Sequence, residues 1–443
     1  MTHAVELPVE NTDARPSALR ALPQRCKLCG VEQDAAPVAI CEHCLGPLEP
    51  LYSPDRRLPS RATIESRATS LWRYREWLPF DWSGVADDAL PDVLSPDTGF
   101  TPLVHAPRLA ERLGVARAWI KNDAVSHPTL SFKDRVVSTA INAARSFGLD
   151  TVGCASTGNL ANAVAAHAAR AAMQAWIFIP EDLEEGKVIG TLVYGPNLVR
   201  VRGHYDDVNR LCAQLADRFG WGIVNVNLRG YYGEGSKTMA FEIAEQLGWR
   251  LPDAVLAPMA GGSLLTKLRR GFSEFAEAGL VEGELPRMYG AQAEGCAPIV
   301  RLFESGGAAL VPETPHTIAR SIAIGNPADG AFAVKAMRDS RGSAQKVSDE
   351  ALVEGIRVLA QTTGIFTETA GGVTVAAALA LAANGHFRRG DEIVLCITGN
   401  GLKTTDAVRD ALPAAPLVNA KVREVAALVA ERDGGGPGLG ARR

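Results

Sequence analysis

The sequence predicts an α/β protein with two lobes, each containing a parallel twisted sheet, and a cleft between the lobes. From residue 100 onward, short apolar runs typical of strands alternate with Ala- and Leu-rich runs whose apolar residues recur at the spacing of a helix face. Alternation of this kind indicates parallel sheets with helices on both faces. The strand-like runs are too numerous for one lobe, and we therefore expect two.

The expected elements are spread over most of the chain. The predicted strands are 118–121, 151–155, 175–180, 198–201, 222–226, 254–259, 288–292 and 393–397. The predicted helices are 136–147, 159–172, 205–219, 235–247, 263–278, 348–363 and 370–383. The last strand is apolar throughout, which predicts a position in the middle of a sheet.

Changes in composition divide the chain into segments. We expect a disordered tail at 1–24, a cysteine-rich module at 25–48, a connecting arm at 49–97, an α/β domain at 98–415 with its smaller lobe at roughly 135–235, and a C-terminal helix and disordered tail at 416–443. The arm contains several prolines, which argue against one long element there. Its aromatic and charged run LWRYREWLPF suits packing on another domain or subunit.

Composition and charge exclude several classes of protein. Of 443 residues, 47% are hydrophobic and 22% charged, as in a globular protein with a sizeable core. Lys and Arg number 46 and Asp and Glu 50, a near balance that argues against binding to nucleic acid or to an anionic membrane. No apolar run approaches the ~18–20 residues of a membrane span, and the first residues lack a secretory signal. We therefore expect a cytoplasmic protein.

Four of the eight cysteines form two C-x2-C knuckles separated by eleven residues: Cys26, Cys29, Cys41 and Cys44. Two knuckles supply the four thiolates of a tetrahedral zinc ribbon. Because four protein ligands leave no open position, the metal is expected to be structural. The alternatives are two disulfides or a ribbon without metal. The other four cysteines are single residues in apolar surroundings and are expected to be inert.

Lys133 stands at the expected start of a helix, with Ser131 as the predicted N-cap. The helix dipole disfavours a cation at this end. The position suits a lysine whose amine is deprotonated and attacks a carbonyl group. The alternative interpretation is a surface lysine in the charged run FKDR.

Three further loops follow the carboxyl ends of predicted strands. Two of them, Ser156–Asn159 and Ala260–Leu264, precede helices and offer free backbone N–H groups to a carboxylate or phosphate. In the third, the hydroxyl of Thr398 is placed to meet a neutral ring nitrogen. Each loop alone is also explained by ordinary capping or turn formation, and for Thr398 a turn residue is the more common explanation. Together with Lys133 they predict a site for pyridoxal phosphate (PLP), a carbonyl cofactor with a phosphate group.

The same segments resemble the threonine synthases, a family of fold-type-II PLP enzymes. The resemblance is carried by HPTLSFKDR, CASTGNLANAVAAHAAR, YYGEGSKTMAFE, PMAGGSLLTK, HTIARSIAIGNPADG, GIFTETAGGVTVAAAL and ITGNGLKTTDAV, spread over residues 98–410. It implies that Lys133 carries PLP and that Asn159 contacts the ring hydroxyl. It also implies that Thr398 binds the pyridine nitrogen and that the cofactor phosphate is bound by Ala260, Gly261, Gly262, Ser263 and Leu264. Substrate carboxylate would be held by Ser156, Thr157, Gly158 and Asn159.

The chain departs from the family pattern at three positions. Leu160 and Tyr232 replace a threonine and an arginine that often bind the substrate phosphate, and Leu130 replaces a glycine before the SFKD motif. Residues expected to take over phosphate binding are Asn227, Arg229 and Lys237. The alternative for the two cations is a solvated loop charge.

The resemblance implies conversion of O-phospho-L-homoserine and water to L-threonine and phosphate by a homodimer. The Lys133 amine would remove the α-proton of the substrate. Two other possibilities remain. One is a related enzyme with dehydratase or β-replacement activity, such as a cysteate-synthase-like one, favoured by Leu160 and Tyr232. The other is a binding or regulatory protein on an inactive PLP scaffold, which Lys133, Asn159 and Thr398 argue against.

Overall fold

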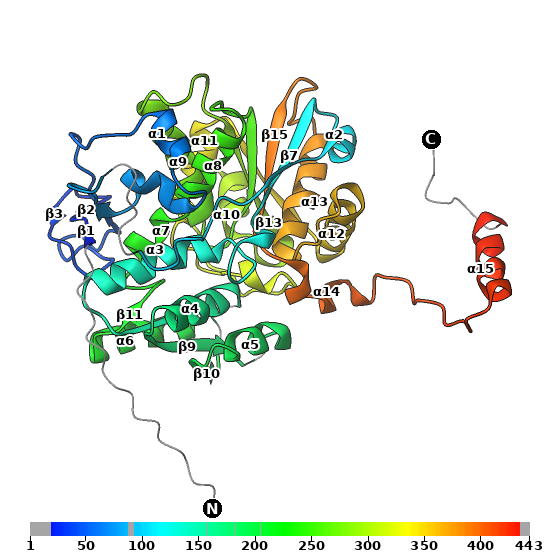
Figure 1. Cartoon of the computed structure of the whole chain (residues 1–443), viewed down its shortest axis with the longest axis horizontal. Helices are drawn as coiled ribbons and strands as arrows, with labels where there is room; N and C mark the ends of the chain where they lie inside the picture. Colours follow the sequence, from blue (N-terminus) through cyan, green and yellow to red (C-terminus); the bar gives the residue numbers. More distant parts are fainter. Residues whose placement is uncertain (1–18, 87–92, 157, 182, 204, 435–443) are drawn as a thin grey trace, which may run out of the picture. The chain divides into compact units, whose positions relative to one another are not determined.

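The computed structural model describes residues 19–86, 93–156, 158–181, 183–203 and 205–434. The chain forms two units: a large one that extends to Thr405, and a small one that begins at Asp406. The large unit holds two α/β lobes and the N-terminal module, shown in Figure 1. The fold class predicted from the sequence is confirmed.

The smaller lobe is built on a four-stranded parallel sheet in the order β10-β9-β8-β11. The strands are β8 (Thr151–Ala155), β9 (Gln174–Pro180), β10 (Asn197–Val201) and β11 (Gly222–Ile223). Its helices are α3 (Lys133–Ser146), α4 (Asn159–Arg170), α5 (Glu185–Leu192) and α6 (Tyr205–Phe219). Alternate residues of β9 pack on opposite sides: Ile177 and Ile179 join the core with α3 and α4, whereas Phe178 joins the core with α6.

The larger lobe contains a six-stranded sheet in the order β14-β13-β12-β15-β7-β6. The strands are β6 (Leu103–His105), β7 (Arg117–Asn122), β12 (Ala254–Pro258), β13 (Arg287–Ala293), β14 (Ser343–Val347) and β15 (Glu392–Ile397). All pairs are parallel except β6 with β7. Every residue of β15 is buried, as predicted for a strand in the middle of a sheet.

Helices cover this larger sheet. They are α2 (Pro107–Leu113), α8 (Lys237–Gln246), α9 (Ser263–Glu277), α10 (Pro298–Ser305), α11 (Gly330–Asp339), α12 (Asp349–Thr363) and α13 (Thr369–Ala383). The apolar faces of α8, α9, α10 and α11 share one core with the side chains of β12, β13 and β15. The Ala-rich α13 is buried over most of its length and contacts the same strands.

The N-terminal module comprises a ribbon and an arm. The ribbon is a three-stranded antiparallel sheet of β2 (Gln24–Cys26), β3 (Glu32–Gln33) and β4 (Leu48–Pro50). Residues 1–18 of the expected tail lie outside the described residues. The rest of that tail is ordered, because β1 (Arg20–Ala21) pairs with β5 (Phe80–Asp81) and Leu19 is buried.

The arm packs on the α/β domain of its own chain. It contains α1 (Arg61–Ser66) and the 3-10 turn η1 (Leu71–Trp77). Tyr74 and Trp77 are fully buried against the rings of Phe241 and Phe275 on α8 and α9. Burial of large aromatic rings contributes heavily to such contacts, and the arm is therefore part of the folded core.

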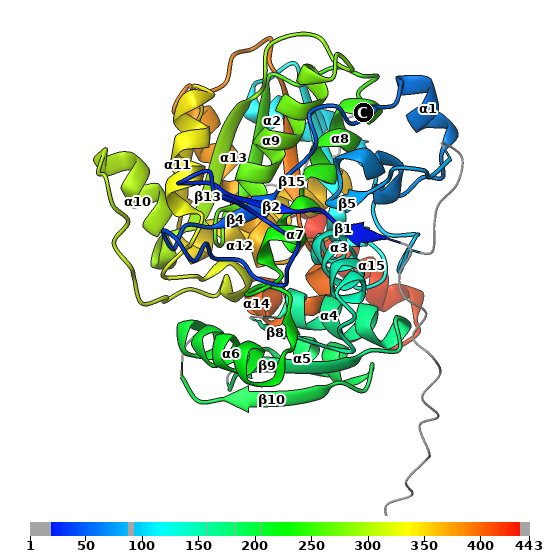
Figure 2. The ribbon, with the colours of Figure 1, turned by 90° about the vertical axis from the view of Figure 1, so that its left-hand side faces the viewer.

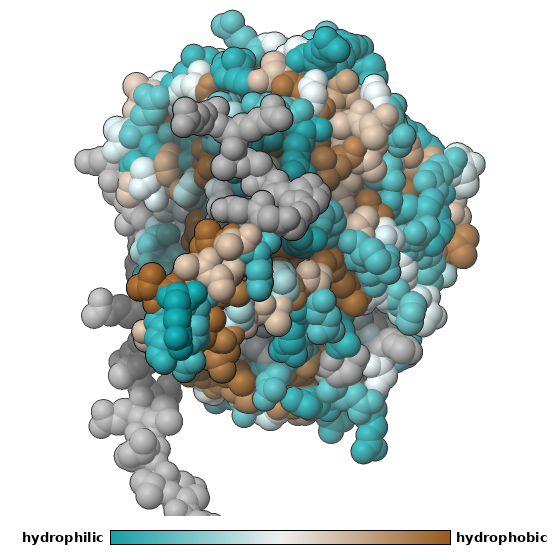
Figure 3. All heavy atoms as spheres, turned by 90° about the vertical axis from the view of Figure 1, so that its right-hand side faces the viewer, coloured by the Kyte–Doolittle hydropathy of each residue, from teal (hydrophilic) through white to brown (hydrophobic). Residues whose placement is uncertain are grey.

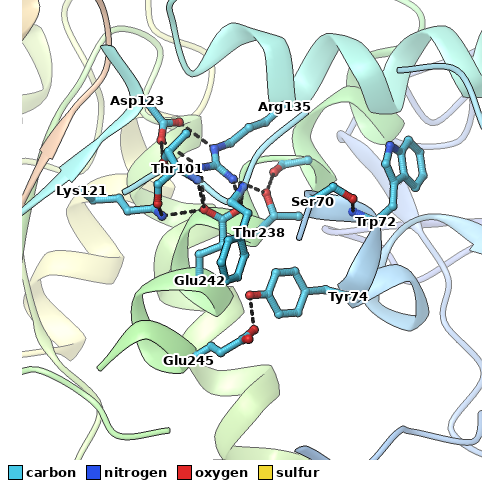
Figure 4. A network of polar contacts seen from close by, with 12 residues as sticks. Ser70, Trp72, Tyr74, Thr101, Lys121, Asp123, Arg135, Thr238, Glu242 and Glu245 are labelled. Carbon is cyan, nitrogen blue, oxygen red and sulfur yellow. Dashed lines mark hydrogen bonds and ion pairs between the residues drawn. The ribbon is translucent and has the colours of Figure 1, made fainter. Parts of the chain in front are cut away.

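A buried polar network beside η1 ties the elements of the two lobes together (Figure 4). Arg135 on α3 forms ion pairs with Asp123 and Glu242, and Lys121 on β7 lies 2.6 Å from Glu242. All four charged side chains are fully buried. Burial alone would raise the pKa of Glu242, but Arg135 and Lys121 outweigh it and hold that pKa at about 2. Glu242 therefore stays ionised, and the two acids and two bases pair with one another in the buried network.

The small unit contains α14 (Asp406–Arg409) and α15 (Val422–Gly434). Among the described residues, no helix combines the length and apolar character needed to cross a membrane. The face drawn in Figure 3 is hydrophilic over much of its area, with apolar side chains between the polar ones.

Candidate active site

A cavity lies between the two lobes and contains most of the predicted site. Side chains from both lobes line it, including Lys133, Ser156 and Asn159 from the smaller lobe. The larger lobe contributes residues of the Gly-rich loop before α9 and the end of β15: Ala260, Gly261, Gly262, Ser263, Leu264 and Thr398. Four segments separated by up to 265 residues in sequence, from Lys133 to Thr398, are thus brought to one place.

Lys133 is the first residue of α3, as expected, but the predicted cap is wrong. The N-cap position is Phe132, without a side-chain capping bond. Ser131 instead pairs with Gly399 as an isolated β-bridge, and its buried hydroxyl has no hydrogen-bond partner among the described residues. The backbone N–H of Phe132 donates to the carbonyl of Thr398 at 2.9 Å. These contacts fix the start of α3 on the end of β15.

The Lys133 amine is buried in a setting that favours its neutral form. Burial lowers the pKa of Lys133 to about 8, and the negative charge of Glu368 partly offsets this effect. Its Nζ donates to Tyr232 Oη at 3.1 Å and lies 4.5 Å from the centre of the Phe132 ring. An amine with this pKa is available as a base and nucleophile near neutral pH.

The loop before α4 presents Asn159 to the cavity. Ser156 Oγ accepts the N–H groups of Gly158 at 3.0 Å and Ala161 at 2.8 Å, so its side chain caps the helix, as the alternative interpretation held. Asn159 Nδ2 donates to both carboxylate oxygens of Glu368, at 2.7 and 2.9 Å. Gly158 has a φ of 132°, which favours glycine. Thr157 lies outside the described residues.

The Gly-rich loop before α9 fits a phosphate group. Gly262 has a φ of 90° and is the N-cap of α9, a helix without a side-chain capping bond. A Cβ on Gly261 would meet no atom within 4 Å, so the loop backbone is open on that side. The hydroxyl of Ser321, in the lining of the same cavity, has no hydrogen-bond partner among the described residues. Free N–H groups at a helix N-terminus and an unpaired hydroxyl are suitable donors to a phosphate.

Three residues predicted to bind substrate phosphate are not part of the cavity lining. Asn227 accepts the N–H of Ile223 at 2.7 Å and donates to the carbonyl of Trp221 at 3.0 Å, so its amide holds a turn. The buried Lys237 lies 2.6 Å from Glu234 and 2.9 Å from Glu274. It is neither a solvated charge nor directed at the cavity.

Arg229 lies nearer to the site. It begins α7 (Arg229–Glu234), is one-third exposed and pairs with Asp329 at 2.6 Å. Burial raises the pKa of Tyr205 and of Tyr232, and the positive charge of Arg229 opposes the shift in both. Both tyrosines line the cavity, as does Leu160. The guanidinium therefore acts on the cavity electrostatically from its present position.

Sequence interpretation missed Glu368, Lys403 and Tyr205 as site residues. Glu368 lies in the segment TETAGG, which was recognised as a family motif without a role for the acid. Lys403 donates to Asn159 Oδ1 at 3.3 Å from the loop after β15. Tyr205 carried no signal, because its position depends on how α6 lies against β8.

The ribbon sulfurs form a candidate metal site. The Sγ atoms of Cys26, Cys29, Cys41 and Cys44 all lie within 4.8 Å of one another. The distance is 3.4 Å from Cys26 to Cys44 and 3.7 Å from Cys29 to Cys41, too long for disulfide bonds. Four thiols converging on one point match a tetrahedral zinc shell.

The site and fold define a PLP enzyme, and comparison with known proteins agrees. Residues 94–399 match the family described as pyridoxal-phosphate dependent enzyme, and the chain belongs to this family. Solved structures share the fold. Maize serine racemase aligns with a TM-score of 0.57 at 21% identity, covering 69% of this chain and 91% of that one. An L-serine ammonia-lyase from Rhizomucor miehei aligns with a TM-score of 0.61 at 20% identity, covering 71% and 98%.

Relatives found by sequence comparison indicate which branch of the PLP-dependent enzymes contains this chain. The threonine synthase of Methanocaldococcus jannaschii is 36% identical over 388 residues, 87% of this chain and 93% of the relative. That of Methanosarcina acetivorans is 34% identical over 402 residues, 90% and 96% of the two chains. Within the PLP enzymes, the chain therefore belongs to the threonine synthases, as its motifs predicted.

Proposed function

We propose that this protein is a PLP-dependent lyase that converts O-phospho-L-homoserine and water to L-threonine and phosphate. The observation that carries the proposal is the burial of the Lys133 amine in a cavity that the Gly-rich loop and Thr398 also line. An amine, a phosphate cradle and a neutral hydroxyl in one cavity match the aldehyde, phosphate and ring nitrogen of PLP. When bound, PLP supplies an electron-accepting ring.

The residues of this chain bind and orient the reactants. The backbone N–H groups at the start of α9 and the Ser321 hydroxyl would hold the cofactor phosphate. Thr398, at the end of β15, would meet the ring nitrogen with a neutral hydroxyl and leave it unprotonated. Asn159 is oriented by Glu368 and Lys403, and its amide would face the ring hydroxyl. Lys133 Nζ would take the α-proton of the substrate.

Substrate recognition divides between the two sides of the cavity. The loop Ser156–Asn159 would hold the carboxylate, because it lies at the N-terminus of a twelve-residue helix. Arg229 is the cation that we propose for the substrate phosphate, since it already acts on the cavity tyrosines. Asn227 and Lys237, expected from the sequence for the same role, would have to leave their present partners to reach the phosphate.

A second candidate function is a dehydratase or β-replacement reaction on a related amino acid. The observation that favours it is the lining itself, where Leu160 and Tyr232 stand at positions expected to contact phosphate. An apolar side chain and a phenol suit a small uncharged leaving group better than a phosphate.

Two measurements test the proposal. Purified holoenzyme is incubated separately with phosphohomoserine, phosphoserine, serine and threonine, while phosphate and oxoacid are assayed. Phosphate release from phosphohomoserine with threonine as product is expected, whereas oxoacid from serine or threonine would favour the second candidate. Borohydride reduction followed by peptide mapping should place the pyridoxyl group on Lys133. Lys133→Ala should abolish both turnover and labelling, and a label elsewhere would contradict the assignment.

Zinc in the ribbon, a homodimeric assembly and a cytoplasmic location complete the proposal. Zinc is supported by the four converging thiols, the homodimer by the resemblance alone, and the cytoplasmic location by the expectation from the sequence. Metal analysis should find one zinc ion per chain. Light scattering coupled to size-exclusion chromatography should give twice the chain mass.

A further inference from the structure

The reacting amine of Lys133 has a defined partner. Its Nζ lies 3.1 Å from the phenol oxygen of Tyr232. Among the described residues, this phenol is the one hydrogen-bond partner of the amine. The family pattern places an arginine at this position, and two cations in contact would repel each other. The tyrosine therefore places a neutral hydrogen-bonding group, and not a cation, beside the Lys133 amine.

Tyr232 is held firmly by its helix and by the ribbon behind it. Its backbone N–H donates to the carbonyl of Leu228 at 2.9 Å, and its side chain is 8% exposed. On the outer side of α7, Tyr231 donates to the carbonyl of Leu22 at 2.9 Å. A Cβ on Gly230 would lie 3.1 Å from the carbonyl oxygen of Leu48, so β4 packs directly on this helix (Figure 2). The phenol is thus presented to Lys133 from a fixed support.

Burial and the surrounding charges determine the protonation state of the Tyr232 phenol. Burial raises the pKa of Tyr232 far above that of a free tyrosine, so the phenol keeps its proton. Glu368 and Cys154 lie close enough to act electrostatically on the amine, and Cys154, Arg229 and Tyr205 act on the phenol. A neutral phenol accepts an N–H from an ammonium group and donates its own O–H to a neutral amine. It therefore has a hydrogen bond for both forms of Lys133.

We propose that Tyr232 is a catalytic residue that orients the Lys133 amine and stabilises its ammonium form. This inference rests on the proposed function of Lys133 as the base. When a proton passes from a substrate carbon to Nζ, one N–H of the resulting ammonium group points to the phenol oxygen. The phenol proton stays in place throughout. The hydrogen bond is stronger with the charged form, because charge-assisted hydrogen bonds exceed neutral ones.

The test compares Tyr232→Phe with Tyr231→Phe. The control removes the same hydroxyl from the adjacent residue of the same helix, where it contacts Leu22 and not Lys133. In the cofactor-free protein, the pKa of Lys133 is measured from the pH dependence of labelling by an amine-reactive reagent, with the Lys133 peptide quantified by mass spectrometry. Tyr232→Phe should lower this pKa by about one unit, a tenfold change in the ammonium equilibrium, and Tyr231→Phe should not change it.

Turnover gives a second readout. In the holoenzyme, Tyr232→Phe should lower kcat about tenfold with a smaller change in KM and a displaced acid limb of the pH profile. Tyr232→His, which keeps a hydrogen-bond acceptor, should recover part of the loss. Equal losses in Tyr232→Phe and Tyr232→His, or an unchanged Lys133 pKa in Tyr232→Phe, would overturn the proposal.

The two readouts separate this inference from the function on which it rests. If the wild-type enzyme does not turn over phosphohomoserine, the proposed function fails, but labelling still measures the contact between Tyr232 and Lys133. If the wild-type enzyme is active and Tyr232→Phe retains its kcat and pH profile, only the inference fails. Should Tyr232→Phe unfold, its melting curve would reveal this, and Tyr232→His would then carry the comparison.

Discussion

Glu368 has two roles in the cavity, one toward a neighbour and one toward the reacting amine. Both its oxygens accept from the amide of Asn159, whose carbonyl oxygen in turn accepts from Lys403. Because both ends of the amide are hydrogen-bonded, it cannot rotate freely, so its orientation is fixed before any ligand arrives, and Oδ1 keeps one lone pair for a further contact. The same carboxylate opposes the lowering of the pKa of Lys133 by burial. Glu368 thus acts both on Asn159, the proposed contact of the cofactor ring, and on Lys133, the proposed base.

Replacement of Glu368 should therefore displace the pH profile. Because a carboxylate stabilises a nearby ammonium group, Glu368→Gln should lower the pKa of Lys133 below its value of about 8. The amine would then be neutral at more acidic pH, and the acid limb of the kcat profile should move down by about 0.5–1 unit. Steady-state rates between pH 6 and 9 measure this shift.

The control for this variant removes one negative charge elsewhere. Glu304 pairs with Lys346 on the surface and does not line the cavity, so Glu304→Gln should keep the wild-type profile. An acid limb that does not move in Glu368→Gln, or that moves to higher pH, would show that the carboxylate does not act on Lys133.

At the scale of elements, the turn from β12 to α9 requires glycine at one position and not at its neighbour. Gly262 has a left-handed φ of 90°, and a Cβ there would lie 3.0 Å from the carbonyl oxygen of Asp329. Gly261 lies outside the left-handed region, and a Cβ on it would meet no atom within 4 Å. Gly262 is therefore needed for the backbone path, whereas Gly261 leaves room for a ligand.

Alanine substitutions at Gly262 and Gly261 should differ in their effects on the stability of the fold. Gly262→Ala should destabilise the fold by about 1–3 kcal/mol, the usual cost of backbone strain. Because the substitution would displace the backbone N–H groups at the start of α9, the affinity for PLP should fall at least about tenfold. Gly261→Ala should keep the wild-type melting temperature. Thermal melts and absorbance titration with PLP measure both effects, and wild-type affinity in Gly262→Ala would remove the Gly-rich loop from the proposed phosphate site.

Elements with a strong local pattern were predictable from the sequence, and those shaped by distant contacts were not. The apolar runs of β8 and β15 stood out because these strands are buried on both faces. The strand β14, Ser343–Val347, was missed because it lies at the edge of the sheet and its three polar residues are all partly exposed. Ser131 failed as a cap because its backbone pairs with Gly399, more than 260 residues away.

In the site as well, side chains positioned by contacts with distant segments could not be predicted from the sequence. Lys133, Asn159 and Thr398, which line one cavity, could be singled out from the sequence because each follows or begins an element with a clear pattern. Lys237 belongs to a recognised motif, but its ammonium group faces Glu274, which lies on another helix. Sequence proximity to a motif does not tell which way a side chain points. Glu368 reaches the cavity because its backbone N–H donates to Gly399 at the end of β15, a contact with no local signature.

At the scale of the whole chain, the ribbon is placed to influence the active site. Its strand β4 packs on α7, the helix that begins at Arg229 and presents Tyr232 to the cavity. Lys27, between two of the predicted metal ligands, lies 4.3 Å from the ring centre of Phe332 on α11. Few apolar residues hold the ribbon together, since its buried core consists of Cys26, Cys41 and Leu48 among the described residues. A bound metal would therefore supply much of its stability.

Removal of the metal should weaken both the fold and the site. Without zinc, the four cysteines lose the ion that would cross-link the end of β2 to the loop before β4, and α7 loses its outer support. Chelation at neutral pH should lower the melting temperature by several degrees and reduce kcat more than it changes PLP content, and added zinc should restore both. Cys44→Ser should behave like the chelated enzyme. Cys212→Ala, which removes a single cysteine from the core of the smaller lobe, should keep its zinc. Full activity in a protein shown by metal analysis to contain no zinc would mean that the position of Tyr232 does not depend on the metal-bound ribbon.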